Sequence, residues 1–281
     1  MKRILVPTDF TDTAENGLDV AADLAEELNA EILLLNVIYP VRGTTFTAMG
    51  DVNKMPRGEA DRFMVELVRT NKVRLQEEIK NYEDRNITIT PHIDFENKTH
   101  GLNHFVKENE VDFIVIGTKG SKSLTEYLFG SHTENIIKAS DCPVISIKEP
   151  TKDFKPKNIV FAVDIQKEEY YGIDDLQEFA EEFNSQVHFL YVMDDGVDNN
   201  EAVSKLQNLA DSNHFKNYTI NTLENSNVEN TIKKFARRKE ADMLAVVSEG
   251  KKGIKELIFG SVTNDIINNM HEPVLVMSKE K

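Results

Sequence analysis

The sequence predicts an α/β protein built from two tandem, open, five-stranded parallel sandwiches. Its 281 residues suit two domains of roughly 140 residues better than a single hydrophobic core. Residues 3–9 are matched by residues 158–164, and residues 31–37 by residues 186–192, both at an offset of 155. Each half also alternates short apolar runs with amphipathic segments, which indicates right-handed crossovers and a parallel sheet covered on both faces.

The elements of the first half follow from its periodicity. The first two strands are predicted at residues 3–9 and 31–37, where apolar residues dominate. A helix with one buried face is predicted between them, because apolar residues recur at helical spacing: Ala14, Leu18, Ala21, Ala22, Ala25 and Leu28. The remaining elements are predicted in this order: a helical pattern at 59–83, a strand at 87–95, a helix at 102–107, a strand at 113–116, a helix at 133–140 and a strand at 144–147.

The later elements repeat at a different offset. Asp112, Gly130 and Pro143 are matched 130 positions further on by Asp242, Gly260 and Pro273. The fall in offset from 155 to 130 gives the first half 25 extra residues between its second and fourth strands. These matches predict domains at 1–149 and 158–281, joined by a linker at 150–157. The extra segment 39–57 contains Gly, Pro and Thr and is predicted to be a lid or a partner-binding loop.

Composition argues against several classes of protein. Hydrophobic residues make up 40% of the chain, and no window reaches the roughly 18 uncharged apolar residues of a membrane span. A net charge of −15 argues against nonspecific binding to nucleic acid or anionic lipid. The single cysteine, Cys142, is expected to be a buried structural thiol and fits a reducing cytoplasm. Pro7 and Asp9 interrupt the start of the chain, which does not resemble a signal peptide.

A glycine pattern follows the fourth predicted strand: Gly117, two residues, Gly120, nine residues, then Gly130 and Ser131. Glycines allow a sharp turn and a close approach of backbone amides to an anion, and the helix that follows would favour a phosphate. Asp9, Val37 and Gly117 all stand at carboxyl ends of strands, so they are expected on one rim of the sheet, where ligands bind in such folds.

Several of these side chains also have purely structural interpretations. Ser131 begins a Ser-x-x-Glu capping box. Asp9 ends a strand before a helix and could be its N-cap, although Thr11, Asp12 and Thr13 are alternatives. His92, His100 and His104 could share a metal, but they lack a metalloprotease pattern, so solvated or capping histidines are favoured and no metal site is predicted.

Together with the Pro-Thr-Asp-Phe opening at 7–10 and Cys-Pro-Val at 142–144, the glycine pattern resembles the universal stress protein family in its tandem form. The resemblance covers essentially the whole chain and implies Rossmann-like, nucleotide-binding domains related by a pseudo-twofold axis and joined through their last strands, 144–147 and 274–277. Members with the complete glycine motif bind ATP, so the implied cofactor is ATP, AMP or ADP, with or without Mg²⁺. The implied site consists of Pro7, Thr8, Asp9 and Val37 around the adenosine and of Ile116, Gly117, Lys119, Gly120, Gly130, Ser131 and His132 around the ribose and phosphates. His132 departs from the small apolar residue common at its position.

The second copy of the motif is incomplete. Val247 replaces the first glycine, Ala162 replaces Pro7, and Glu249 stands where Lys119 stands. A β-branched valine restricts the backbone and is expected to place methyl groups in the path of a ligand. The second site is therefore predicted to be weak or silent.

The preferred hypothesis is a nucleotide-binding, regulatory or signalling protein of the stress response, with an unknown protein partner. No Walker sequence, dinucleotide fingerprint or nucleophile–base pair is present, so no catalytic residue is assigned. Two alternatives stay open. One is a slow ATP hydrolase that would use Asp9, Glu126 or His132; the other is a protein-interaction module that needs no nucleotide. The tandem chain is expected to form an internal pseudo-dimer, with a homodimer of whole chains as a further possibility.

Overall fold

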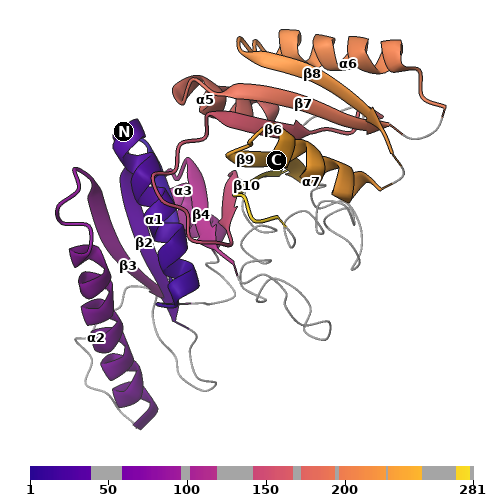
Figure 1. Cartoon of the computed structure of the whole chain (residues 1–281). Coiled ribbons are helices and arrows are strands. Elements are labelled where there is room, and N and C mark those ends of the chain that lie inside the picture. The colour runs from indigo at the N-terminus through magenta and orange to yellow at the C-terminus, as the bar shows by residue number, and fades with distance from the viewer. Residues whose placement is uncertain are drawn as a thin grey trace.

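A computed structural model describes residues 1–38, 59–95, 102–118, 142–166, 172–193, 196–225, 227–248 and 270–278. Both halves contribute to one ten-stranded sheet with the order β3-β2-β1-β4-β5-β10-β9-β6-β7-β8. In Figure 1 this sheet runs from β3 in the first half, across β5 and β10 at the centre, to β8 in the second half. The predicted fold class of two tandem α/β units is confirmed.

The first strand of each half ends two residues before its predicted end at residue 9 or 164, and the other strands with predicted bounds lie within one residue of them. The first half contains β1 (Arg3–Pro7), β2 (Glu31–Ile38), β3 (Thr88–Phe95), β4 (Phe113–Gly117) and β5 (Val144–Ile147). The second half contains β6 (Asn158–Ala162), β7 (Gln186–Met193), β8 (Tyr218–Glu224), β9 (Met243–Ser248) and β10 (Val274–Ser278). Strands are parallel within each half, as apolar runs separated by helices require.

Helices cover both faces of the sheet. The described helices are α1 (Asp12–Leu28), α2 (Glu59–Lys80), α3 (Leu102–Glu108), α5 (Ile173–Glu182), α6 (Asn199–Ser212) and α7 (Val228–Arg238). One core cluster joins the sheet to α1, α2, α5 and α6, and a second joins its other face to α3 and α7. We call these the α1 face and the α3 face. The helix predicted at 133–140 lies outside the described residues.

The halves meet at an antiparallel pair of strands. Ile145 of β5 stands opposite Leu275 of β10, and both side chains are buried. The Ser146 hydroxyl donates a hydrogen bond to the Val274 carbonyl at 3.3 Å. The expected junction through the last strands is thus present. Because β5 and β10 run in opposite directions, the carboxyl ends of the two sets of strands lie at opposite edges of the sheet.

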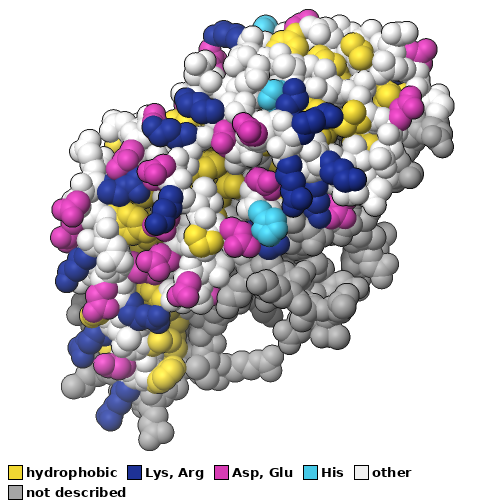
Figure 2. All heavy atoms as spheres, in the orientation of Figure 1, with side chains coloured by type: hydrophobic (Ala, Val, Ile, Leu, Met, Phe, Trp, Pro, Cys, Tyr) yellow, Lys and Arg dark blue, Asp and Glu magenta, His cyan; other side chains and the backbone are white. Residues whose placement is uncertain are grey.

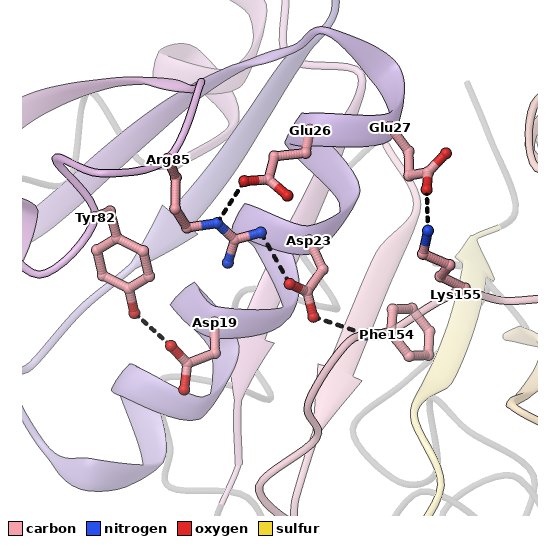
Figure 3. Close-up of polar contacts among 8 residues, drawn as sticks. All are labelled: Asp19, Asp23, Glu26, Glu27, Tyr82, Arg85, Phe154 and Lys155. Atoms are coloured by element: carbon pink, nitrogen blue, oxygen red, sulfur yellow. Dashed lines mark hydrogen bonds and ion pairs between the residues drawn. The ribbon is translucent and has the colours of Figure 1, made fainter.

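The segment between β5 and β6 is anchored to α1. Phe154 is buried, and its backbone N–H donates to Asp23 Oδ2 at 2.7 Å. The other Asp23 oxygen accepts from Arg85 Nη2 at 2.9 Å, and Arg85 Nε also donates to Glu26 at 2.7 Å (Figure 3). One aspartate of α1 therefore ties the connecting segment to the turn that follows α2.

Charge is unevenly distributed over the described surface. Acidic and basic side chains are interspersed over the first half, whereas Lys and Arg side chains gather near α7, whose last turn carries Arg237 and Arg238 (Figure 2). Within the described ranges, none of the helices is long and apolar enough to cross a membrane.

Candidate functional site

Three predicted site residues lie on the α3 face at the carboxyl ends of adjacent strands. Ile116 is buried in the α3-face cluster, and Val37 is partly buried against it. Pro7 alternates with Val6, which belongs to the α1 face, so Pro7 points to the α3 face as well. The rim therefore presents an apolar surface from three strands, β2, β1 and β4, which are neighbours in the sheet.

Asp9 is exposed in the turn between β1 and α1. Its Oδ1 accepts hydrogen bonds from the Thr11 N–H at 3.1 Å and from the Thr11 hydroxyl at 2.6 Å. Thr11, and not Asp9, is the N-cap of α1, since its side chain accepts from the Ala14 N–H at 3.3 Å. The capping interpretation of Asp9 is wrong. In the second half Asp164 forms the same turn with the Gln166 N–H at 3.0 Å.

Thr8 differs from its neighbours because its side chain points to the α1 face. It is 7% exposed, and its hydroxyl lies 3.3 Å from a Glu78 carboxylate oxygen and accepts from the Phe10 N–H at 3.0 Å. Its carbonyl accepts from Asn36 Nδ2 at 2.8 Å, and Asn36 Oδ1 accepts from Asn71 Nδ2 at 2.8 Å. The Thr8 side chain is therefore bonded to α2 and points away from the α3 face, and the predicted contact of Thr8 with the adenosine stays a prediction.

Glu78 is a half-buried acid beneath this rim. Burial raises the pKa of its carboxyl group, and the nearby carboxylates of Glu15 and Asp9 raise it further, whereas the Thr8 hydrogen bond and Arg74 act in the opposite direction. Asn36, Asn71 and Glu78 were not among the predicted site residues. The sequence signal that could have identified Asn71 and Glu78 is a polar residue at a core position of a helical pattern.

Gly117 has a packing role that the glycine motif did not reveal. A Cβ atom at this position would lie 1.7 Å from the Thr13 carbonyl oxygen in the first turn of α1. Gly17 of α1 is also constrained, though less tightly, since its Cβ would lie 2.7 Å from the Gly117 nitrogen. Two glycines therefore allow α1 to lie directly on the end of β4.

Val247 occupies the matching position at the end of β9, and the segment 167–171, which corresponds to the first turn of α1, lies outside the described residues. Val247 is partly buried against the cluster that contains α5, so its methyl groups contribute to the core of the second half. Helix α5 begins at Ile173, which corresponds to Leu18 of α1 at the offset of 155. Packing is thus one role of these methyl groups, and their effect on a ligand stays a prediction.

The other predicted site residues cannot be placed. Lys119, Gly120, Gly130, Ser131 and His132 lie outside the described residues, as do His100 and the segment 39–57. The structure brings together Pro7, Thr8, Asp9, Val37, Ile116 and Gly117 at one edge of the sheet.

The histidines do not form a shared site in the described part of the chain. The His92 ring packs edge-on against Phe105 at 5.2 Å, its Nε2 is buried without a hydrogen-bond partner, and burial lowers its pKa. His104 is exposed and lies 3.1 Å from Glu108. Among the described residues no three His, Cys, Asp or Glu side chains are grouped to hold a metal ion. The single cysteine, Cys142, is buried, as expected.

Strand order defines the class of this protein. In each half the chain first builds outwards from one central strand and then returns to its other side, which gives the orders β3-β2-β1-β4-β5 and β8-β7-β6-β9-β10. This is an open, doubly wound α/β architecture, present twice, whose ligand position is the edge where the order reverses. In the first half that reversal lies between β1 and β4, where Asp9 and Gly117 stand.

The chain belongs to the universal stress protein family, whose model matches residues 1–148 and 155–278. It is similar in fold over 98% of its length to 98% of a universal stress protein from Archaeoglobus fulgidus, with a TM-score of 0.75 and 17% identity. It is 31% identical over 157 residues to universal stress protein MJ0577 of Methanocaldococcus jannaschii, covering 52% of this chain and 94% of the relative. Universal stress protein YxiE of Bacillus subtilis is 29% identical over 147 residues, 52% of this chain and 98% of that protein. These two matches each span one half of the tandem chain.

Proposed function

We propose that the first half binds one adenine nucleotide, as ATP, ADP or AMP, with or without Mg²⁺. The observation that carries this proposal is the reversal of strand order between β1 and β4, where the exposed Asp9 and the apolar Pro7, Val37 and Ile116 share one edge. The complete glycine motif begins there at Gly117. An apolar surface suits a base, while loop amides at a helix start suit phosphates.

The second half is proposed to bind nucleotide weakly or not at all. Ala162 and Val247 replace Pro7 and Gly117. The N-cap of α5 is Gly172, which aligns with Gly17, whereas α1 begins earlier, with Thr11 as its N-cap. The matching edge therefore differs both in its strand-end residues and in where the first helix begins.

We further propose that the protein acts in the cytoplasm as a regulatory or signalling component of the stress response, through a protein partner. The units are taken as residues 1–149 and 158–281 with a linker at 150–157. The family and the acidic, tandem chain support this role. No catalytic residue is assigned.

Calorimetry of the whole chain with Mg-ATP tests the proposal. One binding site per chain is expected, and Asp9→Ala should weaken it at least tenfold, about 1.4 kcal/mol, by removing an exposed acceptor at the rim. The matched control is Asp164→Ala, which should leave the affinity unchanged. Two equal sites, or no binding, would overturn the proposal. Measuring ADP released over hours would show whether the protein also hydrolyses ATP.

A further inference from the structure

A buried polar chain connects α2 to the candidate nucleotide rim. Thr8, Asn36 and Asn71 are 7%, 6% and 8% exposed, and their hydrogen bonds form a continuous path from α2 through β2 to β1. Glu78 lies about two helical turns after Asn71 on the same face of α2, and its carboxylate accepts a hydrogen bond from the Thr8 hydroxyl. Buried polar groups are stable only when they are paired, and these groups are paired with one another.

The second half fills the same positions with three apolar side chains and one tyrosine, whose hydroxyl accepts a hydrogen bond from Gln166 at 3.4 Å. Val163 and Tyr191 correspond to Thr8 and Asn36 at the offset of 155. The buried positions of α2 and α6 align at an offset of 131 residues, at which Asn71 and Leu75 match Ala202 and Leu206. At the same offset Glu78 matches Leu209. All four counterparts, Val163, Tyr191, Ala202 and Leu209, belong to the hydrophobic core. The fold therefore does not require the Thr–Asn–Asn chain or the acid at these positions, because core side chains fill them in the second half.

A second contact holds the same turn. The Arg74 guanidinium of α2 lies 4.0 Å above the centre of the Phe10 ring. Phe10 has a φ of 65°, a left-handed conformation that a bulky residue rarely adopts without support. Through Glu78 on Thr8 and Arg74 on Phe10, α2 contacts the residues on both sides of Asp9.

The helix also reaches past the sheet. Figure 1 shows α2 continuing beyond the carboxyl ends of β2 and β3. Near this end Met64 is fully buried against Ile38 and Phe95, while Phe63 is 58% exposed. The helix thus extends from the rim to a surface that a partner could contact. It also includes some of the extra residues of the first half that have no counterpart in the second half.

We infer that α2 regulates the nucleotide site of the first half, with Glu78 and Arg74 as positioning residues for the turn that carries Asp9. This inference rests on the proposed nucleotide binding. Docking of α2 holds Asp9 ready for the ligand, so bound nucleotide must in return stabilise the docked helix, since coupling between two equilibria is reciprocal. Anything that displaces α2 lowers nucleotide affinity, and anything that holds it raises affinity.

Glu78→Leu tests this directly, because it installs the residue of the second half. Affinity for Mg-ATP, measured by calorimetry on the whole chain, should fall about fivefold or more. The urea midpoint should stay the same or rise, because a half-buried acid is replaced by an apolar residue. Glu78→Gln, which can still accept from Thr8, should bind within about twofold of the wild type. Arg69→Ala, on an exposed turn of the same helix, is the matched control and should bind normally.

Hydrogen exchange on the wild type provides a second measurement that needs no variant. Saturating Mg-ATP should slow exchange of amides in residues 71–82 more than in residues 202–213 of the second half. Equal ATP affinity of Glu78→Leu and wild type, or α2 exchange that ignores bound ATP, would overturn the inference and leave nucleotide binding intact. A wild type that takes up no ATP would overturn both.

Discussion

The two halves of this protein share a skeleton but differ beneath their first strand. In the first half the α1 face under β1 holds Thr8, Asn36 and Asn71 in a hydrogen-bonded chain; in the second half the same space is filled by core residues. Likewise, Gly117 lets α1 lie on β4, whereas Val247 packs into the core of the second half. The two copies therefore differ in how the first helix packs on the sheet, in addition to the one glycine that differs in the loop motif.

Other repeated residues do the same work in both copies. Asp112 accepts a hydrogen bond from the Arg3 N–H at 2.7 Å, and Asp242 accepts from the Asn158 N–H at 2.8 Å. Each aspartate thereby joins the start of the fourth strand of its half to the start of the first. Repetition at these positions reflects a shared architectural need.

The largest effect is expected at the glycine. Gly117→Val should destabilise the protein by about 3 kcal/mol or more, because its side chain would meet the backbone of α1 and must displace the helix. Urea denaturation followed by circular dichroism measures this. Val247→Ala, the control in the second half, should cost only about 1 kcal/mol. If Gly117→Val were as stable as the wild type but lost ATP, the glycine would serve the ligand alone.

The junction between the halves should come next. Leu275→Ala and Ile145→Ala each remove a buried side chain at facing positions of β10 and β5, at a cost of about 3 kcal/mol each. Since the two residues are partners, the double variant should cost less than the sum of the single ones. Strict additivity would show that the halves do not share this part of their core.

A smaller difference in stability is expected between variants of Asp23 and of its counterpart, Glu178. Asp23→Ala should cost about 2 kcal/mol, because it removes the acceptor for both the Phe154 N–H and Arg85. Glu178 is 65% exposed and pairs only at the surface with Lys2, so Glu178→Ala should change stability by less than about 1 kcal/mol. Equal losses in urea denaturation would show that the connecting segment gains nothing from its anchor on α1.

The smallest expected effect is a pH dependence that only the first half provides. The folded-state pKa of Glu78 is raised, so its contribution to stability is present below the ordinary glutamate value of 4.5 and is lost as the pH rises through the folded value. Glu78→Gln removes this titration, and its urea midpoint relative to wild type should increase from about pH 4.5 to about pH 7. Glu77→Gln, on the exposed side of the same helix, is the control. A constant difference across that range would contradict the predicted shift.

Much of the fold was predictable because it depends on local patterns. Short apolar runs located the strands, and the two offsets revealed both the repeat and the extra segment. The apolar runs at 144–147 and 274–277 needed a partner and have each other. The site was predictable only in part. Spacing brought Asp9, Val37 and Gly117 to one edge, but it could not show that the Thr8 side chain points to the other face.

What sequence patterns missed depends on contacts between distant segments. Gly117 matched a loop motif, and its second role became visible only with Thr13 beside it. Asn71 lies within a long amphipathic pattern, and its role depends on Asn36, which is 35 residues away. The N-cap of α1 had several candidates in the sequence, and only the hydrogen bonds identify Thr11.

The antiparallel junction of β5 and β10 determines the directions from which ligands or partners could approach the two halves. Ten strands spaced about 4.8 Å apart make a sheet roughly 40 Å wide, with the two strand-end edges facing opposite ways. A molecule seated on the second half would not compete sterically with a nucleotide on the first. A partner on the edge of the second half would therefore approach from the side opposite to the proposed nucleotide site of the first half.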